Sequence, residues 1–127
     1  MAKKQIIKPV KAASAVGPYN QAVRLGELLF CSGQIPIDPA TGNLVSGNIK
    51  AQAERVLENV KAILDDQSLT FANVVKSTVF LTNLADFADM NEVYAKYFTS
   101  EFPARSTVQV AGLPKGANVE IEVIAHF

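Results

Sequence analysis

Charged and hydroxyl side chains alternate with apolar ones in the last two predicted strands of this 127-residue chain, 104–110 and 119–127. Arg105 and Thr107 are two residues apart, as are Glu120 and Glu122. Successive side chains of a strand point to opposite faces, so each pair shares a face. We predict one sheet face carrying all four. A desolvated arginine binds a carboxylate through paired hydrogen bonds, and a neighbouring glutamate can transfer protons. The pattern therefore predicts binding of a small carboxylate with acid–base assistance.

The opposite face of the last strand is wholly apolar, which places it under helices. The polar face has a simpler interpretation as a solvated surface, where an Arg–Glu pair contributes under about 1 kcal/mol. Against this, Ile124 shares the face with the charges, and a chain with two helices leaves one sheet face uncovered. Self-association would bury that face and trap its charges between subunits.

The elements that must position these residues follow from hydrophobic periodicity. Apolar residues at three- and four-residue spacing predict a helix from about Asn48 to Leu64, with Asn48 or Ser46 as its cap, and a second helix before Phe102-Pro103. Strands are expected at 3–7, 22–25, 28–32, 74–82, 104–110 and 119–127, with a hairpin turn at Gly26. The stretch after Ser32 is expected to be turns. This order favours one α+β domain over residues 1–127, with both helices on one face of a mixed sheet.

Composition excludes several classes of protein. The formal net charge is zero, without a basic block, which argues against nucleic-acid binding. The one cysteine, Cys31, cannot form an intrachain disulfide, and the one histidine, His126, cannot supply a multi-histidine metal site. No stretch has the roughly 20 apolar residues that span a bilayer, nor a secretory signal. We expect a soluble, cytoplasmic protein with no membrane partner.

Four sequence motifs, in this order along the chain, resemble those of the RidA/YjgF family of 2-iminobutanoate/2-iminopropanoate deaminases. They are Val16-Gly17-Pro18-Tyr19-Asn20-Gln21-Ala22, Cys31-Ser32-Gly33-Gln34-Ile35-Pro36, Phe102-Pro103-Ala104-Arg105-Ser106 and Glu120-Ile121-Glu122. The resemblance covers essentially the whole chain. It implies a chorismate-mutase-like fold, a homotrimer around a central β-barrel and active sites between subunits. It also implies hydrolysis of unstable imino and enamino acids, such as 2-aminoacrylate, to keto acids and ammonia without a cofactor or metal.

The resemblance assigns roles residue by residue. Arg105 is similar to the arginine that binds the substrate carboxylate, Glu120 to the residue that orients or deprotonates water, and Tyr19 to a tyrosine that hydrogen-bonds water or the leaving nitrogen. The remaining site positions are expected to line the cleft as substrate-binding residues, and they are Ser32, Gly33, Phe87, Asn91 and Thr107. Six of these residues have a plainer interpretation: an ion pair for the two charged residues, packing for Tyr19 and Phe87, a turn for Gly33 and a helix-face hydrogen bond for Asn91.

Thr107 departs from the family pattern, because many members carry cysteine there. A thiol nucleophile is therefore unavailable at this position, although hydrolysis by water does not require one. Two alternatives stay open from the sequence: a non-catalytic trimeric module that binds small carboxylates, and an RNA-directed translation inhibitor or chaperone-like protein.

Overall fold

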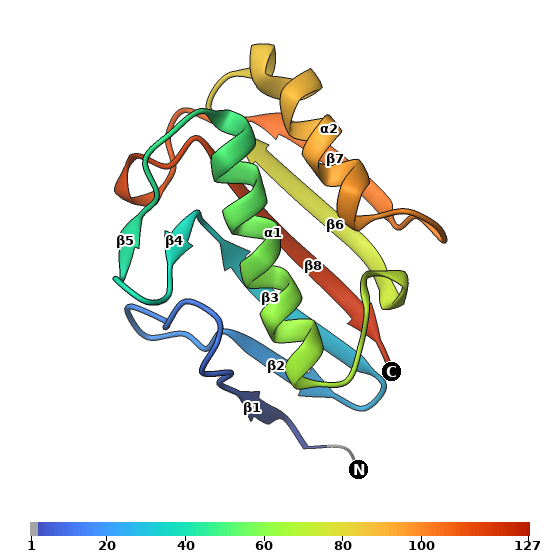
Figure 1. The fold of residues 1–127 in the computed structure, drawn as a ribbon. Helices are drawn as coiled ribbons and strands as arrows, with labels where there is room; N and C mark the ends of the chain where they lie inside the picture. Colours follow the sequence, from blue (N-terminus) through green and yellow to red (C-terminus); the bar gives the residue numbers. More distant parts are fainter. Residues whose placement is uncertain (1–2) are drawn as a thin grey trace.

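The computed structural model describes residues 3–127, which form a six-stranded sheet with two helices on one face (Figure 1). Only β6 and β7 pair in parallel, and the other neighbouring strands are antiparallel. The sheet is therefore mixed, as predicted. Across it the strands run in the order β1 (Gln5–Ile7), β2 (Ala22–Leu25), β3 (Leu28–Gln34), β8 (Val119–His126), β6 (Val74–Leu81) and β7 (Ala104–Gln109).

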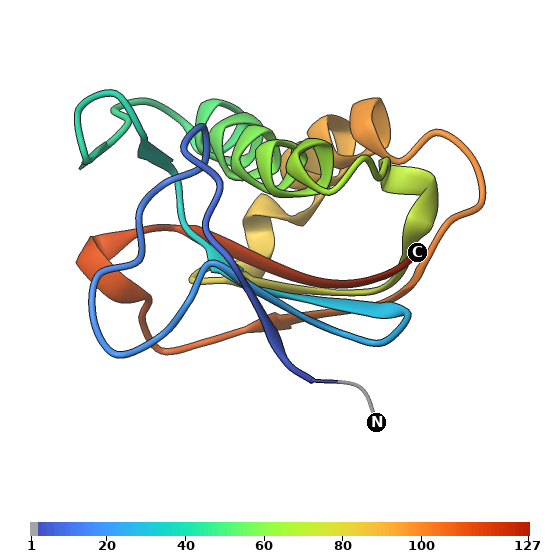
Figure 2. The same cartoon turned by 90° about the horizontal axis from the view of Figure 1, so that it is seen from below.

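Both helices lie on the same side of the sheet, and the opposite sheet face has no helix over it (Figure 2). Helix α1 spans Ile49–Asp66, and its cap is Asn48, whose side chain accepts a hydrogen bond from the Ala51 N–H. Helix α2 spans Phe87–Tyr97 and follows a 3-10 turn at Leu84–Asp86. Both predicted helices are thus confirmed.

The hydrophobic core fills the space between the helices and the sheet. The apolar residues of β8 that were predicted to face the helices, Val119, Ile121, Val123 and Ala125, are at most 2% exposed. They pack with the buried stripe of α1: Ile49, Ala53, Val56, Leu57, Val60, Ile63 and Leu64. Burying a large aliphatic side chain contributes about 1.5–3 kcal/mol. This packing fixes which face of β8 is turned away from the core.

The stretch after Ser32 contains structure that the sequence analysis missed. Strand β3 continues to Gln34, and a short hairpin pairs β4 (Ile37–Asp38) with β5 (Asn43–Leu44). These two strands have only two residues each, too few to show a period-two pattern. Their position is held by Asn59 of α1, which donates to the carbonyls of Ile35 and Ile37.

Candidate functional site

The structure corrects the predicted arrangement of charges: Arg105 and Thr107 do not share a face with the two glutamates. In the parallel pair, Arg105 is opposite Ser77 of β6, whose buried hydroxyl bonds to Tyr94 of α2. Arg105 and Thr107 therefore face the helices. Glu120 and Glu122 are opposite Phe80 and Thr78 of β6, on the uncovered face. Period-two alternation shows which residues of one strand share a face. The pairing register decides which face of the neighbouring strand lies on the same side of the sheet.

Arg105 is held by side chains of α2. Its Nη1 donates to Asn91 Oδ1 at 2.8 Å, and its Cζ lies 4.6 Å from the centre of the Tyr94 ring and 5.5 Å from that of Phe87. Such cation–π contacts position the planar guanidinium. Within residues 3–127, no carboxylate forms an ion pair with it. The guanidinium is thus anchored by neutral groups, and its charge is left for a ligand.

A hollow of about 340 Å³ opens beside this arginine, between α2 and the segment before β7. Arg105, Asn91 and Tyr94 supply its polar groups, and Phe98 and Phe102 supply its apolar wall. Thr107 lies two residues further along β7, and its Oγ1 is buried without a hydrogen-bond partner. Sequence reasoning missed Tyr94 as a site residue, because its position on the apolar stripe of the helix indicates only packing.

The other predicted site residues gather on the uncovered face and at the end of the sheet. Gly33 lies directly against Glu120, since a Cβ added to Gly33 would be 2.8 Å from Glu120 Cδ. The Ser32 hydroxyl donates to the Asn20 carbonyl. Tyr19 accepts a hydrogen bond from the Val16 N–H at 3.2 Å, which leaves its own hydroxyl proton free to donate. Tyr19 and Gly33 line a shared hollow of about 150 Å³.

Glu120 is the titratable group with a perturbed environment in this second cluster. Burial raises the pKa of its carboxyl above the ordinary glutamate value, and the negative charge of Glu122 raises it further. Both effects disfavour the ionised form. A raised pKa makes the carboxylate a stronger proton acceptor, which suits general-base chemistry.

These two clusters lie too far apart to act on one small molecule within a single chain. Arg105 and Glu120 pair with residues three positions apart on β6, and β7 and β8 flank that strand. At about 3.3 Å per residue and 4.8 Å per strand, their Cα atoms are roughly 14 Å apart. They also face opposite sides of the sheet. Within one chain, therefore, a small ligand can contact only one of the two clusters.

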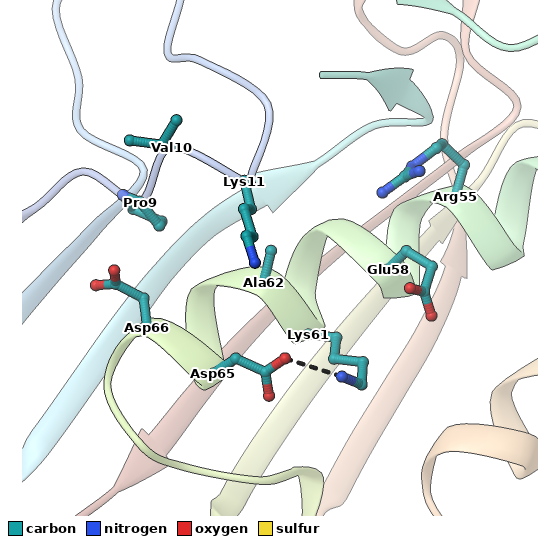
Figure 3. Close-up of a pocket in the computed structure, with 9 residues that line it drawn as sticks. All are labelled: Pro9, Val10, Lys11, Arg55, Glu58, Lys61, Ala62, Asp65 and Asp66. Carbon is teal, nitrogen blue, oxygen red and sulfur yellow. Dashed lines mark hydrogen bonds and ion pairs between the residues drawn. The ribbon is translucent and has the colours of Figure 1, made fainter. Parts of the chain in front are cut away.

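A larger hollow lies elsewhere, between α1 and the segment at Pro9–Lys11 (Figure 3). Its volume is about 500 Å³, and it contains none of the predicted site residues. Three basic and three acidic side chains line it, and Lys61 pairs with Asp65 at 2.8 Å (Figure 3). Among residues 3–127 there is no cluster of metal-binding side chains, and no helix is long and apolar enough to cross a bilayer.

Comparison with known proteins places this fold and these residues in a family. The family model described as endoribonuclease L-PSP matches residues 10–127. The chain is 55% identical to protein DfrA of Myxococcus xanthus over 98% of its length and 96% of that protein. It is 47% identical to human 2-iminobutanoate/2-iminopropanoate deaminase, covering 96% of this chain and 89% of the human one.

A solved structure agrees with this assignment. The crystal structure of Escherichia coli TdcF with bound serine has a TM-score of 0.92 and 47% identity, and the match covers 97% of this chain and 98% of that one. The fold is that of a small α+β protein with a six-stranded mixed sheet and two helices. The chain belongs to the RidA/YjgF family, in which deaminases are known.

Proposed function

We propose that this protein hydrolyses reactive imino acids, 2-iminopropanoate and 2-iminobutanoate with their enamine tautomers, to 2-keto acids and ammonia in the cytoplasm. The observation that carries the proposal is Arg105, half-buried, anchored by Asn91 and Tyr94, and free of any carboxylate partner within residues 3–127. The name of the human relative supports the choice of substrate. No cofactor or metal takes part in the proposed reaction.

Arg105 binds the substrate carboxylate in this proposal. Asn91 occupies Nη1 from the α2 side, and the Tyr94 ring supports the guanidinium. The remaining N–H groups form a planar fork that matches two carboxylate oxygens. Bidentate binding fixes the plane of the imino acid and therefore the direction from which water attacks its C2 carbon.

The two half-sites combine when copies of the chain associate, and we propose a homotrimer closed around a β-barrel. The uncovered sheet face carries apolar side chains that are about 40% exposed: Leu28 (39%), Phe30 (40%) and Val108 (42%). Burial of this surface would drive association. The Arg105 cluster of one subunit would then meet the Tyr19, Gly33 and Glu120 cluster of its neighbour, since one chain cannot bring them together.

The chemical step requires only water and a proton acceptor. An enamine first tautomerises to the imine. Glu120 accepts a proton as the water oxygen bonds to C2, and the imine nitrogen is protonated to give a carbinolamine. Glu120, which has passed the water proton to the imine nitrogen, next takes the carbinolamine hydroxyl proton and gives it to the amine nitrogen. The C=O bond then forms as the C–N bond breaks, and NH3 leaves. Tyr19, whose hydroxyl proton is free, hydrogen-bonds water or the departing nitrogen. Imines hydrolyse spontaneously in water, so the enzyme needs to lower the activation free energy only modestly. Each tenfold acceleration corresponds to about 1.4 kcal/mol.

A coupled assay tests this proposal. A threonine or serine dehydratase generates the imine, and keto-acid appearance is followed with wild type, Arg105→Ala and Glu120→Gln. Lys96→Ala is the control, because it removes a charge from α2 outside the hollows described above. We expect acceleration by wild type and Lys96→Ala, and losses of 100-fold or more in the other two variants. No acceleration by wild type would refute the deaminase function.

The bound serine of TdcF favours the alternative of a carboxylate-binding module. A module of this kind needs Arg105 and Asn91 but not Glu120. If wild type bound 2-keto acids without accelerating imine hydrolysis, and Glu120→Gln bound them equally well, the binding function would replace the catalytic one. The RNA-directed alternative gains no electrostatic support from a chain of zero net charge.

A further inference from the structure

The hollow that Tyr19 and Gly33 line is also lined by residues of the turn between β7 and β8. Pro114 and Lys115 of this turn line the hollow. Lys115 is the one charged residue among the described residues that do so. Most of the other lining residues are small or apolar, among them Ala13, Ala15 and Ile35. The hollow is thus an apolar recess with one cation at its edge.

The backbone conformation at Lys115 is one that lysine does not favour, so the requirements of the turn do not explain a lysine at this position. Its φ and ψ are 57° and 19°, in the left-handed region that favours glycine and asparagine. The next residue, Gly116, also has a positive φ, of 74°, without any cost. Non-glycine residues in this conformation concentrate at functional sites. Lysine is a poor choice for this backbone conformation, yet Lys115 lines the recess.

The ammonium of Lys115 also has no partner of its own. Within residues 3–127 it forms no ion pair, and its side chain is exposed. Glu120, the proposed base, does not line the recess itself, but its side chain lies directly against Gly33, which does. Gly33 connects the two places, so the side chain of a substrate whose C2 carbon is next to Glu120 would pass Gly33 to enter the recess that Lys115 lines.

We propose that Lys115 is a specificity-determining residue and that the recess accepts 2-imino acids whose side chain ends in a carboxylate or amide oxygen. This inference rests on the proposed deaminase function. A volume of about 150 Å³ corresponds to roughly five heavy atoms at the 30 Å³ occupied by a water molecule. The glutamate side chain has that size, so 2-iminoglutarate and its amide fit, and hydrolysis would give 2-oxoglutarate and ammonia. Flavin-dependent amino-acid oxidation is the class of reaction that supplies such imines.

The test compares 2-iminoglutarate with an apolar imine of the same shape. D-Aspartate oxidase acting on D-glutamate gives the former, because the planar imine carbon retains no handedness, and D-amino-acid oxidase acting on D-homoleucine gives the latter. The proteins are wild type, Lys115→Asn, which suits the left-handed backbone without a charge, Lys115→Arg, which keeps the charge, and Lys96→Asn as the control. All are checked for unchanged melting temperature.

We expect Lys115→Asn to lower the ratio of kcat/KM for 2-iminoglutarate over the apolar imine about tenfold, which corresponds to about 1.4 kcal/mol. Lys115→Arg restores most of the ratio, and Lys96→Asn leaves it unchanged. An unchanged ratio in Lys115→Asn overturns the inference. The affinity for 2-oxoglutarate over 5-methyl-2-oxohexanoate, measured by calorimetry, should fall in the same variant. This binding readout tests Lys115 even if wild type fails to accelerate 2-iminopropanoate hydrolysis, which would refute the proposed function instead.

Discussion

Replacement of Gly33 by alanine should displace the Glu120 carboxylate while leaving the fold intact. The added Cβ would lie 2.8 Å from Glu120 Cδ and 3.1 Å from Cγ. Carbon atoms in contact are normally about 3.5–4.0 Å apart, so the carboxyl group must move by about 1 Å. A displacement of that size at a reacting group can cost about 100-fold in rate. That factor corresponds to about 2.7 kcal/mol of transition-state stabilisation.

Gly112→Ala provides the matched control. An added Cβ there meets no atom within 4 Å, and Gly112 does not have a positive φ. We expect Gly33→Ala to lower kcat/KM for 2-iminopropanoate about 100-fold in the dehydratase-coupled assay, and Gly112→Ala to retain wild-type activity. Melting temperatures of both should stay within a few degrees of wild type, because the Glu120 side chain can rotate away. Full activity in Gly33→Ala would show that the position of Glu120 does not matter, and the assignment of the base would be wrong.

Further predictions concern the pH dependence, the anchor of the arginine, the thiol and the helix cap. Because the pKa of Glu120 is raised, its carboxylate takes up a proton at a higher pH than an ordinary glutamate does as the pH falls. The rate should therefore decline on the acid side of a pH–rate profile, and this decline should be absent in Glu120→Gln. Asn91→Ala should raise the KM for imino acids about tenfold, because it removes a charge-assisted hydrogen bond to Arg105. Steady-state kinetics measures this KM, and an unchanged value would contradict the prediction. Burial raises the pKa of the Cys31 thiol to about 12, so iodoacetamide should label it only after denaturation, as mass spectrometry would show. Asn48→Ala should reduce the free energy of unfolding by about 1 kcal/mol in a urea titration, and an unchanged value would deny the cap a role.

Much of the fold could be predicted because its signals are local. The spacing of apolar residues marked α1, and the alternation in β8 identified its buried face, since a helix and a strand impose fixed periods on a sequence. Asn48 was one of two caps predicted from their place before that stripe, and the structure selects it over Ser46. The hairpin of β4 and β5 could not be predicted, because two residues are too few to show a period and a buried side chain of α1, Asn59, holds the adjoining carbonyls.

The sequence by itself determined which residues are available for chemistry: Arg105, Glu120 and Tyr19 lie in motifs that identify the family. Only the tertiary structure decided how these residues are grouped. Alternation along β7 and β8 could not show that Arg105 faces the helices while Glu120 faces away, because their relation depends on hydrogen-bond register through β6. That register arises from the packing of the whole sheet against α1 and α2, and it places Arg105 and Glu120 on opposite faces of the sheet.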